Sequence, residues 1–164
     1  MEKSGITIQI PGHGDLRLRR LVSDYTGTLS YRGKLVAGVD EKLRALSASL
    51  DIHVLTADTR GTATEQLHGL PIQIHQLEAT NEDGQKRDFA AQWDLRSVAS
   101  LGNGANDRLL LKSVKQAGGL AVAVDNGEGC AIDTLMTAHV FIVGAANALD
   151  LLVDTGFVKA TLRF

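Results

Sequence analysis

One acidic residue stands where an apolar run meets a glycine-containing turn. Asp24 follows Leu21-Val22-Ser23 and precedes Tyr25-Thr26-Gly27-Thr28. A carboxylate in such a turn can attack a phosphoryl group and become an aspartyl phosphate, which divides a difficult hydrolysis into two easier steps. The same carboxylate can bind Mg²⁺, a cation that prefers oxygen ligands and accepts one or two carboxylates beside water and phosphate. Asp24 is therefore a candidate nucleophile and a candidate metal ligand.

Two further turns and a lysine carry groups that suit the same chemistry. Thr56 ends an apolar run, and its hydroxyl could hold phosphate oxygens together with nearby backbone amides. In Gly102-Asn103-Gly104-Ala105-Asn106-Asp107 the glycines permit close backbone approach, and side-chain oxygens of Asn103 and Asp107 could complete a magnesium site. Lys86 lies between these two turns in the sequence. Its charge could neutralise the phosphoryl group and the nucleophile during transfer.

Each of these residues also has an ordinary structural interpretation. Asp24 could be a turn residue and Asp107 an acid favoured by the dipole at a helix start. Thr56 could cap a strand end and Lys86 could be a solvated helix charge, and for these two the structural interpretation is preferred when each is taken alone. Taken together it is disfavoured, because three polar loops would have to follow three apolar strands by chance.

The segments that must position these residues alternate between strand and helix patterns. Ile6–Ile10 alternates apolar and polar residues, and Leu16–Val22 is extended again after a turn, which predicts an N-terminal β-hairpin. Further strands are predicted at Ile52–Leu55, Ile72–Leu77, Ser97–Leu101, Leu120–Val124 and Val140–Val143. Helices are predicted at Val39–Leu50, Thr62–His68, Asp83–Trp93, Asn106–Ala117, Gly129–Ala138 and Ala145–Val153. This order predicts an α/β fold with a mainly parallel sheet, whose ligands bind at the carboxyl ends of the strands.

Composition and charge restrict the class of protein. A chain of 164 residues with 44% hydrophobic and 22% charged residues fits one globular domain, residues 1–164. A formal charge of -2 argues against nucleic acid and anionic lipid as partners, and no apolar stretch approaches the roughly 20 residues that a bilayer requires. A single cysteine, Cys130, suits a reducing cytoplasm, and the five histidines show no metal-binding spacing. We therefore expect a cytoplasmic protein with no membrane partner.

The combined motifs resemble the haloacid dehalogenase-like (HAD) superfamily, and within it the phosphorylation domain of P-type ATPases and its soluble relatives. Asp24-Tyr25-Thr26-Gly27-Thr28-Leu29-Ser30 resembles DKTGTLT, and Thr56-Ala57-Asp58 resembles TGD. Gly102-Asn103-Gly104-Ala105-Asn106-Asp107 resembles GDGxND. The resemblance covers most of the chain, from Leu18 to about Val143.

The resemblance implies a Rossmann-like three-layer α/β/α sandwich with a short flap, here at Ser30–Val36, and no cap domain. It also implies a magnesium-dependent phosphatase that acts on a small phosphorylated substrate. In that scheme Asp24 is phosphorylated, and Thr56 and Lys86 contact the phosphate. Four groups hold Mg²⁺: the Asp24 carboxylate, the Thr26 carbonyl, Asn103 and Asp107. Capless relatives often form oligomers, so the hairpin and the apolar tail Leu151–Phe164 are candidate homo-oligomer contacts, or they close the edge of the monomer.

Two departures from the pattern bear on activity. Many phosphatases of the superfamily carry an acid two residues after the nucleophile, where this chain has Thr26, and a threonine hydroxyl is a poor general acid. Asn103 replaces an acid that usually binds magnesium, so we expect Asp107 to compensate. We therefore predict slow turnover that favours good leaving groups. Two alternatives remain: a receiver-like module that binds magnesium and phosphate or is itself phosphorylated, and a structural subunit.

Overall fold

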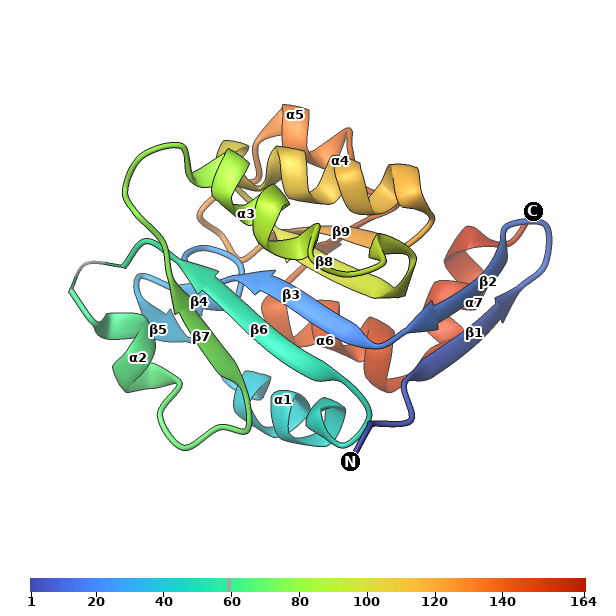
Figure 1. Cartoon of the computed structure of the whole chain (residues 1–164), viewed down its shortest axis with the longest axis horizontal. Coiled ribbons are helices and arrows are strands. Elements are labelled where there is room, and N and C mark those ends of the chain that lie inside the picture. The colour runs from blue at the N-terminus through green and yellow to red at the C-terminus, as the bar shows by residue number, and fades with distance from the viewer. Residues whose placement is uncertain (59) are drawn as a thin grey trace.

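Six parallel strands form the centre of the computed structural model, which describes residues 1–58 and 60–164 (Figure 1). Their spatial order is β10-β9-β8-β3-β6-β7. The strands are β3 (Arg20–Asp24), β6 (Asp51–Thr56), β7 (Gln73–Gln76), β8 (Val98–Gly102), β9 (Leu120–Asp125) and β10 (Val140–Val143). From β3 the chain first moves outward through β6 and β7, and it then returns to the other side of β3 as β8. Such a reversal opens a crevice at the carboxyl ends of the strands, and this is where Asp24 lies.

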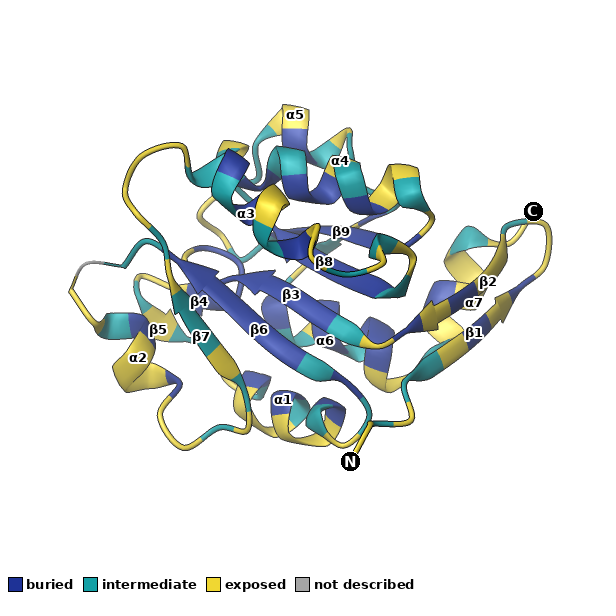
Figure 2. Ribbon diagram, viewed as in Figure 1, coloured by how far each residue is buried: buried dark blue, intermediate teal, exposed yellow. Residues whose placement is uncertain are grey.

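Helices cover both faces of this sheet, as the alternating sequence pattern predicts (Figure 1). One face carries α1 (Val39–Ser47) and α6 (Ala145–Val153), while the other carries α3 (Glu82–Ala90), α4 (Arg108–Ala117) and α5 (Ile132–Leu135). Neighbouring strand residues serve opposite faces: Leu21 belongs to the core on the α1 and α6 side, and Val22 to the core on the α3 and α4 side. Figure 2 shows the central strands buried along most of their length. The prediction of an α/β/α sandwich is confirmed.

The N-terminal hairpin consists of β1 (Ile6–Ile10) and β2 (Gly14–Leu18), which pair antiparallel. We expected one extended run over Leu16–Val22, but the run divides at Arg19, because its first part pairs with β1 and its second part enters the central sheet as β3. The hairpin packs against α7 (Gly156–Leu162), and the Phe164 amide donates to the Pro11 carbonyl at 3.2 Å. The tail and the hairpin thus cover each other within one chain, while a homo-oligomer stays a prediction.

Short elements follow β3 and β6, the two positions where members of the superfamily that the motifs resemble carry inserted cap domains. The predicted flap is a small hairpin of β4 (Ser30–Tyr31) and β5 (Lys34–Leu35). Between β6 and α3 the described residues form only α2 (Thr62–Gln66), β7 and their connections. The carboxyl ends of β3 and β6 are therefore reached from solvent without passing an inserted domain.

Two predicted helices begin later than expected. Gly129–Ala138 contains only the four-residue α5, because Gly127 and Gly129 have φ of 98° and 95° and their amides bond to the Asp125 side chain in a loop. The helix expected from Asn106 begins as α4 at Arg108, after a 3-10 turn over Ala105–Asp107. Among the described residues we find no helix with the length and apolar character needed to cross a membrane.

Candidate active site

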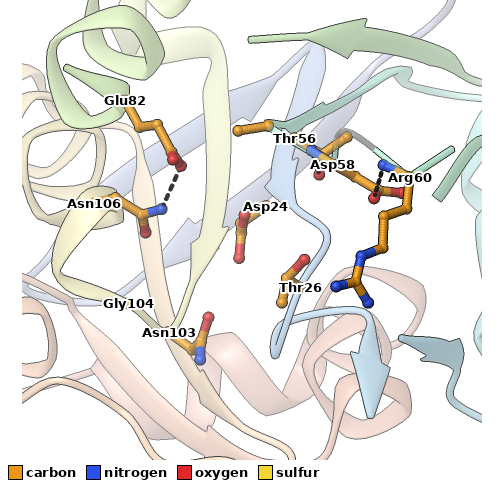
Figure 3. A pocket seen from close by; sticks show the side chains of 10 residues that line it. Asp24, Thr26, Thr56, Asp58, Arg60, Glu82, Asn103, Gly104 and Asn106 are labelled. Atoms are coloured by element: carbon orange, nitrogen blue, oxygen red, sulfur yellow. Dashed lines mark hydrogen bonds between the residues drawn. The ribbon is translucent and has the colours of Figure 1, made fainter. Parts of the chain in front are cut away.

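A polar cavity of about 430 Å³ opens at the carboxyl ends of β3, β6 and β8 (Figure 3). Its walls come from the loops that follow these strands and from the start of α3. The lining residues are Asp24, Thr26, Thr56, Ala57, Asp58, Arg60, Glu82, Asn103, Gly104 and Asn106. The predicted residues Asp24, Thr26, Thr56 and Asn103 thus share one cavity, although they come from three separate loops.

The other two predicted residues lie beneath this cavity and form an ion-pair network with Asp24. Lys86 Nζ donates to Asp24 Oδ1 at 2.9 Å and to Asp107 Oδ1 at 2.7 Å. All three side chains are buried, with Lys86 and Asp107 at most 1% exposed. Lys86 reaches this position from α3, which packs beside α4 and the turn that carries Asp107. The structure therefore brings Asp24, Lys86 and Asp107 together, as the sequence order suggested.

The network contains two carboxylates and one ammonium, so one negative charge is left in excess. Burial, and next the charge of Asp107, raises the pKa of Asp24 to about 7, although Lys86 and Thr28 act in the opposite direction. Burial alone would lower the pKa of Lys86, but the two carboxylates raise it overall, so the lysine stays charged. A cation next to Asp24 would balance this excess charge.

Thr28 connects Asp24 to Asn103. Its Oγ1 lies 3.0 Å from Asp24 Oδ2 and 3.1 Å from Asn103 Oδ1, so these two oxygens approach the same hydroxyl. Gly27 allows this approach, because it has a φ of 75° and a Cβ there would lie 2.4 Å from Asn103 Nδ2. A carboxylate oxygen and an amide oxygen near each other are hard donors that fit a divalent cation such as Mg²⁺.

Among the described residues there is no group of three or more His, Cys, Asp or Glu side chains arranged to hold a metal ion. Asp107 is engaged elsewhere: its Oδ2 accepts from the amides of Asn103 and Gly104, both at 3.0 Å, and its Oδ1 accepts from Lys86. The role of Asp107 as a metal ligand stays a prediction.

The loop after β6 forms a second wall of the cavity. Thr56 Oγ1 accepts from the Asp58 amide at 3.1 Å. Asp58 in turn accepts from the amides of Arg60 and Ala63, at 3.0 Å and 2.6 Å, which ties its carboxylate to the start of α2. The guanidinium of Arg60 extends toward the cavity, and it has no acidic side chain within ion-pair distance in the described part of the chain (Figure 3). It is thus available for an anionic ligand.

Besides Arg60, three more residues near the cavity received no role from the sequence. Asn106 Nδ2 donates to Glu82 Oε2 at 2.8 Å, and both residues line the cavity (Figure 3). Asn126, after β9, donates to the carbonyls of Thr28 and Ser30 at 2.7 Å and 3.3 Å and accepts from the Ala145 amide at 2.6 Å. It thereby clamps the nucleophile loop to α6. The only sequence signal for Asn126 is its position after an apolar strand, where polar residues are common.

Comparisons with known proteins agree on the fold. No protein-family model matches the chain. A deoxy-D-mannose-octulosonate 8-phosphate phosphatase from Haemophilus influenzae, in its cobalt-bound form, is similar with a TM-score of 0.66 and 14% identity, over 90% of this chain and 94% of that one. The 3-deoxy-D-manno-octulosonate 8-phosphate phosphatase from Moraxella catarrhalis, in complex with magnesium, phosphate and KDO, gives 0.66 and 13%, over 87% and 92%. A Legionella pneumophila protein assigned to the HAD superfamily (subfamily III A) hydrolases gives 0.67 and 16%, over 88% and 86%.

One relative is similar in sequence. The uncharacterized protein MJ0073 from Methanocaldococcus jannaschii is 34% identical over 68 residues, which are 42% of this chain and 69% of the relative. The chain belongs to the same protein family as MJ0073, and its fold is that of the HAD hydrolases.

Proposed function

We propose that this chain is a magnesium-dependent phosphohydrolase that forms an aspartyl phosphate on Asp24. The observation that carries the proposal is the position of Asp24, which lines an open polar cavity while a buried lysine holds one of its oxygens. The same cavity presents Thr56, Asn103 and Arg60, which could bind the oxygens of a phosphorylated substrate. The similar structures from H. influenzae and M. catarrhalis are described as phosphatases, which supports this class of reaction.

In the first step Asp24 attacks the phosphoryl group while Lys86 stays bound to the carboxylate and limits charge repulsion. We assign Mg²⁺ to the Asp24 carboxylate, the Thr26 carbonyl and Asn103, with Asp107 acting in support from beneath. When bound there, the ion supplies positive charge for the phosphoryl oxygens and the nucleophile. In the second step water releases phosphate and regenerates Asp24.

Thr26 makes the departure of the leaving group the difficult part of the first step. No acid stands at this position, so an alkoxide would have to leave without a proton. Acyl phosphates and aryl phosphates leave as stable anions and should be preferred. The open cavity fits small phosphorylated compounds, and the soluble, cytoplasmic setting expected from the sequence is part of the proposal.

The test is incubation of the chain with acetyl phosphate or p-nitrophenyl phosphate, with magnesium or with EDTA. We expect product release that requires magnesium and that Asp24→Asn abolishes, while Asp40→Asn, an exposed carboxylate on α1, leaves it unchanged. Stable phosphorylation of Asp24 without turnover would instead support the receiver-like module. The absence of both phosphorylation and turnover would support a structural subunit.

A further inference from the structure

Glu82 and Asn106 form a side-chain pair on the cavity wall to which the proposed chemistry assigns no function (Figure 3). Glu82 is the first residue of α3, and Asn106 lies in the 3-10 turn before α4. The Asn106 amide donates to Glu82 Oε2 at 2.8 Å, so one carboxylate oxygen is fixed in position. The pair joins two elements that also carry Lys86 and Asp107.

The carboxylates of the cavity wall differ in how far their oxygens are already used. Both oxygens of Asp24 are engaged, by Lys86 and by Thr28. Both oxygens of Asp58 accept backbone amides. In the described part of the chain, Glu82 Oε1 is the one carboxylate oxygen of this wall without a hydrogen-bond partner. Thr26 offers only a hydroxyl, which is a poor base.

We propose that Glu82 is the general base of the second step, and this proposal rests on the aspartyl phosphate mechanism above. Glu82 Oε1 accepts a proton from a water molecule as the water oxygen attacks phosphorus. The new P–O bond forms while the bond between phosphorus and the Asp24 oxygen breaks. The products are inorganic phosphate, the free Asp24 carboxylate and a protonated Glu82, which then loses its proton to solvent.

The position of Glu82 favours a base over an acid. It lies in the first turn of a nine-residue helix, where the helix dipole stabilises a negative side chain. A carboxylate is the form of this side chain that accepts a proton. A carboxylate cannot protonate the leaving group in the first step, so good leaving groups are still needed there. It can activate water in the second step, so the aspartyl phosphate is still hydrolysed.

The experiment separates the two steps. The chain is phosphorylated with acetyl phosphate that carries a radioactive phosphorus label, in the presence of magnesium, and is rapidly desalted. Loss of label from the protein then reports the second step alone. In Glu82→Gln we expect an unchanged rate of labelling and a loss of label about 100-fold slower than in the wild type. Asn106→Ala should slow the loss of label by a smaller factor, because the base remains but its orientation is no longer fixed.

The matched control is Glu78→Gln, which removes an exposed carboxylate four residues earlier and outside the cavity, and it should behave as the wild type. Loss of label from Glu82→Gln at the wild-type rate would overturn the role of Glu82. So would an equal decrease in two rates, the rate of labelling and the rate at which label is lost. Neither outcome would contradict a mechanism that passes through an aspartyl phosphate on Asp24. A wild-type chain that takes up no label at Asp24 would overturn the proposed function itself.

Discussion

The Lys86 ammonium lies 2.7 Å from Asp107 Oδ1, and both side chains are buried. Asp107 accepts from the backbone amides of Asn103 and Gly104 in its own loop. The pair therefore holds the Lys86 ammonium in a fixed position beneath the cavity. From that position Lys86 reaches Asp24, the candidate nucleophile. The pair therefore links the loop after β8 to the loop after β3.

Replacing Lys86 should be costly for stability. Lys86→Met leaves two buried carboxylates close together without a positive charge, and we expect the free energy of unfolding to fall by about 3–5 kcal/mol at pH 8. The loss should be smaller at pH 5, where one carboxylate can take up a proton. Urea denaturation measures both values. Lys42→Met is the matched control: its pair with Asp150 is about one-third exposed, so it should cost at most about 1 kcal/mol.

Asp24→Asn should make the protein more stable above neutral pH. The pKa of Asp24 is raised from 3.8 to about 7, so between these values the folded chain binds more protons than the unfolded chain. Stability therefore falls as pH rises through this window, and the substitution removes that loss. We expect a gain on the order of 2 kcal/mol at pH 8 without magnesium, and little gain at pH 4. Equal gains in the free energy of unfolding at both pH values, measured by urea denaturation, would contradict a raised pKa of Asp24.

Thr26→Asp should widen the range of leaving groups. The substitution places an acid in the cavity two residues after the nucleophile, where it can protonate a departing alkoxide. We expect alkyl phosphate hydrolysis to rise about 10-fold or more, while acetyl phosphate hydrolysis changes little. Steady-state rates of hydrolysis of an alkyl phosphate and of acetyl phosphate test this prediction. If alkyl phosphates are already the fastest substrates of the wild type, the leaving-group argument is wrong.

His53 should make stability depend on pH on the acid side. It lies against His75 and Trp93, with Nδ1 3.1 Å from His75 Nε2, and burial, then His75, lowers its pKa from 6.5 to about 4. The unfolded chain therefore binds more protons between pH 4 and 6.5, and stability is lost as pH falls through that window. His53→Phe keeps the aromatic packing and should reduce the loss by on the order of 1 kcal/mol. His68→Gln, at an exposed position, is the control and should leave the pH dependence unchanged.

The sequence predicts what is local. The alternation of apolar strands and amphipathic helices gave the layers correctly, because each helix and strand buries a face that its own residues define. The boundary at Arg19 was missed, since a hairpin strand and a sheet strand have the same extended pattern when no turn separates them. The helix expected over Gly129–Ala138 was too long, because the Gly127 and Gly129 amides donate to the Asp125 carboxylate and favour a loop.

The contacts between side chains within the site are harder to predict from the sequence. The motif order suggested that Asp24, Lys86 and Asp107 meet, but not that both Asp107 oxygens are occupied beneath the cavity. The approach of Glu82 to Asn106 depends on how α3 packs beside α4, and no pattern in either segment records that packing. The roles assigned to the site residues stay predictions for the experiments above.

The clamp made by Asn126 has a consequence for the order in which the protein is built. Asp24, Lys86 and Asp107 all precede Asn126 in the chain, so during synthesis the reactive groups emerge from the ribosome before the amide that secures the nucleophile loop. A nascent chain that stops short of β9 carries every charged member of the network and still lacks that clamp. Competence for chemistry should thus arise only after β9 has joined the sheet and Asn126 has bound the carbonyls of Thr28 and Ser30.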